Sequence, residues 1–342
     1  MRKLDPFSLD SYDYHLPKEL IAKYPAVPST SAKLLVYDRT KDNIEHAYIK
    51  DIERFLPKDT AIIMNDTKVI KARLFGQKST GAKIELLYTK QINNTLHEVL
   101  IKGRIKQDME ILFNEELYAK IRKINKDGSR IVEFIHNKKL LNFEELLWFF
   151  EKIGHIPLPP YIDREDNNND TLTYQSKFAK KAGSVAAPTA SLHFDDELLN
   201  TIKTTHNNAF VTLHIGLGTF KNVEVSDIRE HLIHTERYDI TPEAKEIIDS
   251  KQNILCIGTT ACRSAEHYFK TKQTSGECNI FLHYNNPPQR VNHLLTNFHL
   301  PKSTLIMLVA SMLGVEKTIE LYNEAIAKNY RFYSYGDAML IL

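Results

Sequence analysis

The feature that most constrains the fold is a change of residue pattern within one stretch of the chain, residues 65–149. In this stretch, short runs of strand-forming residues are separated by turn signals such as Lys126-Asp127-Gly128. On either side, segments with helical spacing alternate with short apolar runs, which is typical of an α/β domain. We therefore predict an α/β main domain built from both chain ends, residues 1–64 and 150–342, with an inserted all-β, barrel-like domain at 65–149.

Several secondary-structure elements can be predicted with their limits. A helix is expected from Phe143 to Ile153, where Gly154 ends the helical spacing. The segment Asp163–Asp170 contains only polar residues, so we expect a mobile loop without a core-forming side chain. The clearest further elements are strands at Phe210–Ile215 and Ile254–Ile257 and helices at Thr241–Ser250 and Val315–Ala327.

Composition and cysteine usage indicate the class of protein and its compartment. The chain is 42% apolar and 26% charged, which excludes a disordered or collagen-like chain. Its three cysteines include no CxxC pair, so neither a disulfide framework nor a thiolate zinc site is expected. Charged residues near the N-terminus interrupt any signal sequence, and the apolar run Leu305–Leu313 is too short to span a bilayer. We expect a cytoplasmic protein with no membrane partner.

Five segments carry more small or polar side chains than packing requires, and each leaves two interpretations open. Residues 64–73 can form a functional turn or only a turn at a domain boundary. From Gly183 to Ser191 nearly every side chain is small, which lets backbone N–H groups approach a ligand or lets two elements pack tightly. Residues 214–220 follow a strand and match half of a dinucleotide-binding turn, but the third glycine is missing.

The last two segments contain histidines. His231 and His234 have the spacing HxxH, whereas a helical zinc protease has HExxH, so we expect no metal there. A hydrogen-bonding or proton-transfer role, or a purely structural pair, is the alternative. In residues 295–304, Ser303 or Thr304 can cap a helix whose N-terminus favours an anion, or can simply begin that helix.

Taken in order, these segments are similar to the motifs of one known family, the S-adenosylmethionine:tRNA ribosyltransferase-isomerases of queuosine biosynthesis. The resemblance covers nearly the whole chain. The chain departs from the family pattern at Ser191, where glycine is usual, at Ala261–Glu266 and in the loop His283–Asn292. The matching strings lie at residues 14–22, 64–70, 154–162, 183–189, 212–220, 296–304 and 330–338.

The resemblance implies a reaction that consumes S-adenosylmethionine. The family transfers the ribosyl portion of S-adenosylmethionine to 7-aminomethyl-7-deazaguanine at the tRNA wobble position. The product is epoxyqueuosine in tRNA, and adenine and methionine are released. S-adenosylmethionine is then a substrate, and no metal or redox cofactor is implied. The implied partners are S-adenosylmethionine and the tRNA anticodon stem-loop, and we expect a monomer. The family fold, an α/β domain with an inserted all-β domain, agrees with the division predicted above.

The implied chemistry requires groups that move protons. The ribose 5′-carbon beside the sulfonium must lose a proton, the departing adenine must gain one, and the amine of the tRNA base must attack unprotonated. We rank His214 and His299 first, because both lie beside predicted ligand loops. The catalytic candidates are His214, His299, Asp66, His234 and Glu236. The expected substrate-binding residues are Gly183, Ser184, Ala186, Ala187, Thr189, His193, Gly216, Gly218, Thr219, Thr260, Arg263, Asn297 and Lys302.

The net charge of +2 hides an uneven distribution. Residues 65–149 hold 16 Lys+Arg and 11 Asp+Glu, so the inserted region carries +5 and the remainder −3. We expect this basic region to contact tRNA phosphates, although a solvated strand face would have a similar composition. The expected tRNA-binding residues are Lys68, Arg73, Lys102, Arg104, Lys106 and Arg331.

Two other functions are compatible with the sequence. The turn Gly216-Leu217-Gly218 would also suit a conventional S-adenosylmethionine methyltransferase, which releases S-adenosylhomocysteine. A non-catalytic tRNA-binding protein would consume no S-adenosylmethionine at all. The second alternative fits less well, because a binder needs basic and aromatic groups more than buried histidine and threonine.

Overall fold

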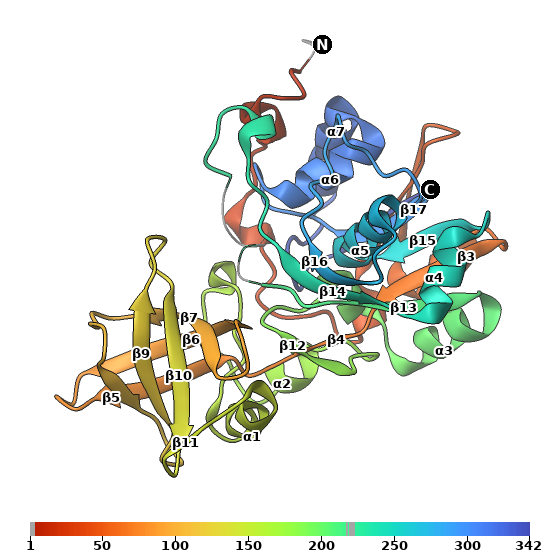
Figure 1. The fold of residues 1–342 in the computed structure, drawn as a ribbon. Coiled ribbons are helices and arrows are strands. Elements are labelled where there is room, and N and C mark those ends of the chain that lie inside the picture. The colour runs from red at the N-terminus through yellow and green to blue at the C-terminus, as the bar shows by residue number, and fades with distance from the viewer. Residues whose placement is uncertain (1–3, 217, 219–222) are drawn as a thin grey trace.

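The computed structural model describes residues 4–216, 218 and 223–342, and Figure 1 shows two bodies of different architecture. The larger body contains, within the described residues, a nine-stranded mixed sheet. Its four central strands run parallel, and antiparallel strands flank them on each side. In sheet order the strands are β16 (Ser275–Cys278), β14 (Glu236–Ile240), β13 (Asn208–Leu213), β3 (Thr60–Asn65), β15 (Asn253–Ile257), β17 (His293–Asn297), β18 (Ala338–Ile341), β1 (Lys33–Asp38) and β2 (Asn43–Tyr48).

Helices cover both faces of this sheet, because its central strands are apolar on both sides. β3 is buried at every position, and its alternate residues enter two different cores. Ile62 and Met64 pack in the core that contains α3 (Asp196–Thr205), whereas Ile63 packs in the other core. The helices of that other core are α4 (Pro242–Asp249), α5 (Thr259–Thr271), α6 (Thr304–Leu313) and α7 (Val315–Ala327).

The predicted strands and helices of this body are confirmed, nearly at their predicted limits. Within the described ranges, no helix is both long and apolar enough to serve as a membrane span. Short 3-10 helices complete the body: η1 (Leu9–Tyr12), η2 (Lys18–Leu20), η3 (Ser29–Ser31), η4 (Ile49–Phe55), η5 (Pro160–Ile162), η6 (Thr189–His193) and η8 (Ile228–Glu230).

The smaller body is an antiparallel β-barrel with its own hydrophobic core. β10 pairs with β7 on one side and with β9 on the other, so the sheet closes on itself. α1 (Phe143–Ile153) packs Phe149 and Phe150 into the same core and ends at Gly154 as predicted. An α/β main domain with an inserted β-barrel is therefore confirmed. In sheet order the strands are β11 (Lys139–Leu140), β10 (Arg130–His136), β7 (Leu96–Lys102), β6 (Lys83–Gln91), β5 (Arg73–Lys78), β8 (Glu110–Leu112) and β9 (Tyr118–Ile124).

A short sheet lies between the two bodies. β4 (Thr67–Val69) pairs in parallel with β12 (Lys181–Ser184) and with no barrel strand among the residues described. The chain therefore leaves the main sheet at Asn65, passes through β4, and enters the barrel at Arg73. The limits 65–149 for the inserted domain stay a prediction.

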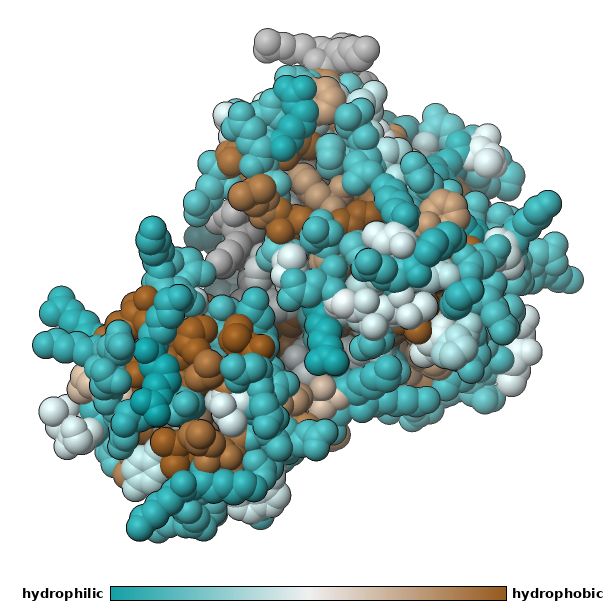
Figure 2. All heavy atoms as spheres, in the orientation of Figure 1, coloured by the Kyte–Doolittle hydropathy of each residue, from teal (hydrophilic) through white to brown (hydrophobic). Residues whose placement is uncertain are grey.

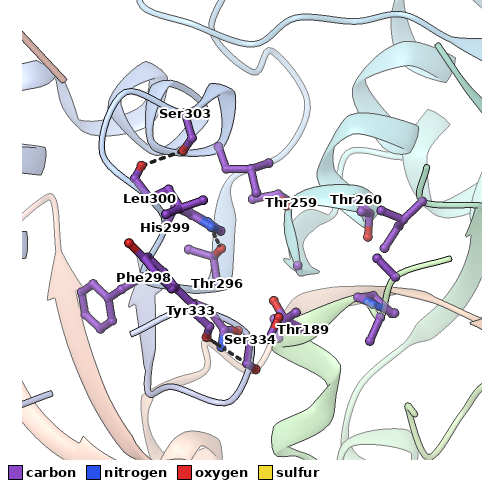
Figure 3. Close-up of a pocket in the computed structure, with 18 of the residues that line it drawn as sticks. Thr189, Thr259, Thr260, Thr296, Phe298, His299, Leu300, Ser303, Tyr333 and Ser334 are labelled. Atoms are coloured by element: carbon purple, nitrogen blue, oxygen red, sulfur yellow. Dashed lines mark hydrogen bonds between the residues drawn. The ribbon is translucent and has the colours of Figure 1, made fainter. Parts of the chain in front are cut away.

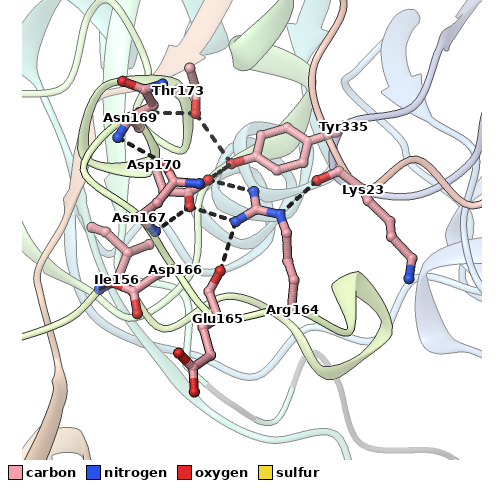
Figure 4. A network of polar contacts seen from close by, with 10 residues as sticks. All are labelled: Lys23, Ile156, Arg164, Glu165, Asp166, Asn167, Asn169, Asp170, Thr173 and Tyr335. Carbon is pink, nitrogen blue, oxygen red and sulfur yellow. Dashed lines mark hydrogen bonds and ion pairs between the residues drawn. The ribbon is translucent and has the colours of Figure 1, made fainter.

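A buried ion pair holds the polar loop at residues 163–170 against the main domain (Figure 4). Arg164 Nη1 and Nη2 each donate to the Asp170 carboxylate at 2.7 Å, and the Tyr335 hydroxyl donates to it at 3.0 Å. Asp170, where α2 (Asp170–Thr173) begins, is only 2% exposed. The expectation of a loop without a core-forming side chain is wrong here, because a carboxylate can be buried once charged donors satisfy it.

Replacing Asp170 with asparagine should lower the free energy of unfolding by about 1.5–3 kcal/mol, because buried hydrogen bonds to a charged group are lost. Denaturant titration at pH 7 measures the change. Burial opposes the shift, but Arg164 lowers the pKa of Asp170, so the stabilisation is lost as the pH falls below the ordinary carboxyl range. The difference between wild type and variant should therefore shrink in acid.

The matched control is Asp163→Asn in the same loop. The Asp163 side chain is 86% exposed and lies 3.7 Å from Lys23 Nζ, so its replacement should change stability by less than about 0.5 kcal/mol. Equal losses in both variants would show that the network contributes nothing particular to stability.

Candidate active site

The carboxyl ends of four parallel strands meet at one edge of the main sheet. β3 ends at Asn65, β13 at Leu213, β15 at Ile257 and β17 at Asn297. In open α/β sheets, ligands bind beyond this edge. The parallel pairing therefore brings together segments that lie far apart in the sequence.

Asn65 joins three elements at this edge. Its Nδ2 donates to the Leu213 backbone oxygen at 3.1 Å and to Thr260 Oγ1 at 3.0 Å. Its Oδ1 accepts from the backbone N–H of Leu213 at 3.0 Å and of Thr67 at 3.2 Å. Asn65 is not among the residues predicted from the sequence, because asparagine before Asp-Thr is an ordinary turn signal. Its place directly after the apolar run of residues 61–64 was the signal that could have found it, since a buried amide there needs several partners.

Asp66, a predicted catalytic residue that directly follows β3, has a buried side chain. Its Oδ1 accepts from Thr212 Oγ1 at 2.6 Å, and its backbone oxygen accepts from the N–H groups of Lys180 and Lys181. It lines neither of the two large cavities described below. These contacts suit a residue that fixes the loop, and a catalytic role for Asp66 stays a prediction.

A cavity of about 680 Å³ opens at the edge of the sheet (Figure 3). The short side chains of Ala186, Ala187 and Ala190 border the open space. The predicted substrate-binding residues Ala186, Ala187, Thr189, Thr260 and Asn297 all lie in its wall. The full lining consists of residues 186–190, 258–260 and 296–300 together with Tyr161, Ile215, Ser303, Leu305, Tyr333 and Ser334.

His299 presents a neutral imidazole in the wall of this cavity. Its Nε2 is 2.8 Å from Thr296 Oγ1. A dashed line marks this hydrogen bond in Figure 3. Its backbone N–H donates to the Tyr322 hydroxyl at 3.1 Å, and its carbonyl accepts from the Tyr14 hydroxyl. Burial lowers the pKa of His299 to about 3, so the ring is uncharged at neutral pH.

A wide groove with about 2,680 Å³ of empty space separates the barrel from the main domain. In Figure 2 the surface is hollowed between the two bodies. Tyr88, Lys90 and Glu98 line the groove from the barrel. The predicted residues Gly183, His214, Gly216, Gly218, His234 and Glu236 line it from the main domain.

His214 is fixed between two segments at the floor of the groove. Its Nδ1 is 2.8 Å from Thr67 Oγ1. A Cβ atom on Gly183 would lie 2.9 Å from the His214 ring, so glycine is required for the close approach of β12. Burial, followed by the charge of Arg237, lowers the pKa of His214 to about 4, which leaves a second neutral imidazole at neutral pH.

Glu236 carries a buried negative charge beside the groove. Its Oε2 pairs with Arg263 Nη1, and its Oε1 accepts from the Gly216 N–H at 3.0 Å and lies 3.3 Å from His234 Nε2. Burial alone would raise the pKa of Glu236, but Arg263 and His234 lower it to about 2. A Cβ atom on Gly218 would overlap the His234 ring. Three predicted residues, His234, Glu236 and Arg263, therefore form one charged cluster.

Three other predicted substrate-binding residues lie outside the two cavities. Ser184 Oγ donates to the Ala186 carbonyl at 2.7 Å and accepts from the Ile215 N–H at 2.9 Å, which holds the small-residue loop. His193 is buried in η6, and burial lowers its pKa to about 4. Lys302 pairs with Asp10 at 2.8 Å and Asp13 at 3.2 Å. Thr219 lies outside the described residues.

The predicted tRNA-binding residues are spread over several surfaces. Lys102, Arg104 and Lys106 are exposed where the chain leaves β7, and none of them lines the groove. Arg73 pairs with Glu85 at 2.8 Å. Lys68 lies half-buried in β4, and Arg331 Nη2 is 3.4 Å from Asp337.

The cations found in the described lining of the groove are not among the residues predicted from the sequence. These are Lys90, Lys181 and Arg237, which come from β6, β12 and β14. They are single residues in three distant segments, so no local charge cluster marks them.

The structure shows no metal arrangement around the HxxH segment. Within the described part of the chain, no group of three or more His, Cys, Asp or Glu side chains is placed to hold a metal ion. His234 contacts Glu236, and the His231 ring packs at 5.5 Å from that of Phe281.

Comparisons with known proteins indicate the family to which the chain belongs. A family model described as "Queuosine biosynthesis protein" matches residues 9–341. The chain is 55% identical to a protein named S-adenosylmethionine:tRNA ribosyltransferase-isomerase from a Nitratiruptor species, covering 99% of this chain and 100% of the relative. It is 57% identical to a protein of the same name from Sulfurimonas denitrificans, covering 97% of each.

A solved structure shares the fold. The S-adenosylmethionine tRNA ribosyltransferase of Thermotoga maritima matches with a TM-score of 0.52 at 28% identity, covering 97% of this chain and 100% of that chain. The family model and the relatives each cover nearly the whole chain, as the sequence resemblance does. The chain therefore belongs to the S-adenosylmethionine:tRNA ribosyltransferase-isomerase family of queuosine biosynthesis.

Proposed function

We propose that this chain transfers the ribosyl portion of S-adenosylmethionine to 7-aminomethyl-7-deazaguanine in the tRNA anticodon stem-loop and rearranges it to epoxyqueuosine. Adenine and methionine leave, so S-adenosylmethionine is a substrate and no further cofactor takes part. The observation that carries the proposal is the junction of two spaces of different size. Ile215 lines both the 680 Å³ cavity and the wide groove, so the space for a small molecule adjoins the space for a large substrate at this residue.

The cavity suits the adenosyl part of S-adenosylmethionine. The alanines of residues 186–190 let the backbone approach a flat ring, and Thr189, Thr260 and Asn297 offer hydrogen-bonding groups. The groove suits the tRNA because it is wide and open, and Lys90, Lys181 and Arg237 line it together with carboxylates such as Glu98, Glu144 and Asp239. We assign the reacting groups to the region around Ile215, where the two spaces meet.

The two neutral histidines divide the proton transfers. His299 lies in the cavity wall, so it removes the proton from the ribose 5′-carbon and returns it to the departing adenine. His214 lies in the groove, so it takes a proton from the ammonium group of the tRNA base, which then attacks as a free amine. The pair Glu236–Arg263 holds the Gly216 turn and His234 in place. We expect the chain to act as a monomer in the cytoplasm.

Product analysis tests the proposed function. The enzyme is incubated with S-adenosylmethionine and tRNA that carries 7-aminomethyl-7-deazaguanine, and the small products are separated. We expect one adenine and one methionine for each modified tRNA. A methyltransferase would release S-adenosylhomocysteine instead, and a non-catalytic tRNA-binding protein would leave S-adenosylmethionine intact.

Replacing His214 with alanine should slow the reaction about 10- to 100-fold at pH 7, which is less than a full general-base contribution. The loss should be partial because the attacking amine also deprotonates in water as the pH rises. The variant should therefore recover toward the wild-type single-turnover rate in alkaline buffer. A loss that is independent of pH would contradict the assignment of His214 to the amine.

Reversing the charges of Lys102, Arg104 and Lys106 should weaken tRNA binding and reduce its salt dependence. If all three contact phosphates, the slope of log affinity against log salt should fall in magnitude by about 2–3. Binding isotherms at several salt concentrations measure the slope. The control reverses three exposed lysines of the main domain, Lys50, Lys58 and Lys251. An unchanged slope in the barrel variant, or equal changes in both, would remove these residues from the tRNA-binding surface.

A further inference from the structure

A third, smaller pocket of about 270 Å³ lies beside α6, and we call it the side pocket. Its walls are largely apolar and include Ile233, Phe281, Leu282 and Leu308. It shares Leu305 with the 680 Å³ cavity and His234 with the groove. The side pocket therefore adjoins both spaces that the proposed function assigns to substrates.

One side chain in the side pocket is a buried cation with an unused donor. Arg263 is 5% exposed, its Nη1 pairs with Glu236, and its Nε donates to the Ile280 carbonyl at 3.3 Å. Its Nη2 is buried and meets no hydrogen-bond partner among the residues that the structure describes. An unsatisfied donor on a buried charged group is costly, so a ligand oxygen at this position would be strongly favoured.

The N-terminus of α6 adds a second feature that favours an anion. Thr304 and Leu305, the first two residues of this ten-residue helix, both line the side pocket. Ser303 Oγ caps the helix by accepting from the Ile306 N–H. This hydrogen bond does not involve the N–H groups of Thr304 and Leu305. The first N–H groups of a helix have no partner within the helix, and they lie at the positive end of the helix dipole. A guanidinium and a helix N-terminus thus face one small apolar space.

We propose that the methionyl portion of S-adenosylmethionine reaches the side pocket with its α-carboxylate, which Arg263 Nη2 and the N-terminus of α6 hold. The inference rests on the proposed function and adds a binding site for the part of the substrate that leaves as methionine. Glu236 lies on the other side of the guanidinium and acts as a positioning residue for it.

A carboxylate fits the site better than a tRNA phosphate, which is the other anion at hand. The side pocket is small and mostly apolar, and Arg263 is almost fully buried. A phosphodiester would have to bring two riboses with it, whereas the carboxylate ends a thin unbranched chain. The side pocket is therefore expected to distinguish S-adenosylmethionine from analogues that lack the carboxylate.

Binding of S-adenosylmethionine and of decarboxylated S-adenosylmethionine to the full-length protein tests the inference by calorimetry. We expect the decarboxylated analogue to bind about 10- to 100-fold more weakly, because it lacks the partner of a buried charged donor. In Arg263→Lys the ammonium can still pair with Glu236, but it has a single nitrogen and cannot place a second one at the position of Nη2. The ratio between the two affinities should then fall below about threefold.

The matched control is Arg290→Lys, another partly buried arginine of the main domain. Arg290 donates to the carbonyls of Ile248 and Gln252 and lines none of the three spaces, so the variant should keep the wild-type ratio. Equal affinities of the wild-type protein for the two ligands would overturn the inference, even if Arg263→Lys did not fold. A ratio that persists in Arg263→Lys, or a loss of tRNA affinity alone, would also overturn it.

The two proposals can fail separately. If wild-type protein releases adenine and methionine but does not distinguish the two ligands, only the side pocket is assigned wrongly. If it distinguishes them but releases S-adenosylhomocysteine, the proposed reaction is wrong.

Discussion

Replacing His299 with alanine is expected to lower the single-turnover rate about 100- to 10,000-fold, the range for loss of a general acid–base group. His299 is the imidazole in the wall of the cavity that we assign to S-adenosylmethionine, and its ring is neutral because burial lowers its pKa to about 3. A neutral imidazole at that place can take the 5′-proton. Without it, water would have to serve as the base in a buried cavity, and the adenine would lose its proton donor.

Affinity for tRNA should change less than about twofold in His299→Ala, because His299 does not line the groove. The control is His46→Ala, since His46 is an exposed histidine of the same domain that lines neither space. Rapid-quench measurement of adenine release with saturating tRNA gives the rate. A near-normal rate in His299→Ala would remove this residue from the catalytic list.

Replacing Glu236 with alanine is expected to lower the free energy of unfolding by about 3–5 kcal/mol, the cost of removing one partner of a buried ion pair. Glu236 is 3% exposed, and the variant would leave the Arg263 guanidinium buried without its counter-charge. The Gly216 N–H and His234 would lose their partner as well. Denaturant titration followed by fluorescence or circular dichroism measures the loss.

Two further measurements define the role of Glu236. Glu277 is an exposed neighbour that lies opposite Arg237 in the register of β14 and β16. Replacing Glu277 should change stability by less than about 0.5 kcal/mol. Replacing Glu236 and Arg263 together by apolar residues should recover most of the loss, because no buried charge is left alone. If the double variant were no more stable than Glu236→Ala, the ion pair would not explain the loss.

The pH dependence of the Glu236 contribution follows from its pKa. The ion pair lowers this pKa to about 2, below the ordinary value of about 4.3. The stabilisation is therefore fully present above the ordinary pKa and is lost as the pH falls toward about 2. Wild type and Glu236→Ala should consequently converge in stability only in strong acid.

The fold could be predicted from the sequence where the residue pattern is periodic. The apolar run of β3, the helical spacing of α7 and the short strands between residues 73 and 140 each indicate one structure. The buried ion pair of Arg164 and Asp170 could not be predicted, because charged residues in a polar run normally indicate a solvated loop. Its partner Tyr335 comes from the other end of the chain.

The candidate site could be predicted only where a local string carries the signal. Loops of small residues and histidines beside strand ends are visible in the sequence, and His214, His299 and the alanines of residues 186–190 do line the two spaces. The groove cations and the bonds of Asn65 depend on which strands lie side by side in the sheet. That strand order brings together residues more than a hundred positions apart. It cannot be predicted from any single stretch of the sequence.

A crystal structure of the protein with S-adenosylmethionine tests the central claim most directly, because it measures the distance from each histidine to the ribose 5′-carbon. We expect the adenine against residues 186–190, the 5′-carbon within about 3.5–4 Å of the His299 ring, and the ribose directed past Ile215 toward the groove. S-adenosylmethionine bound in the groove with the 680 Å³ cavity left open, or a 5′-carbon far from His299, would contradict it.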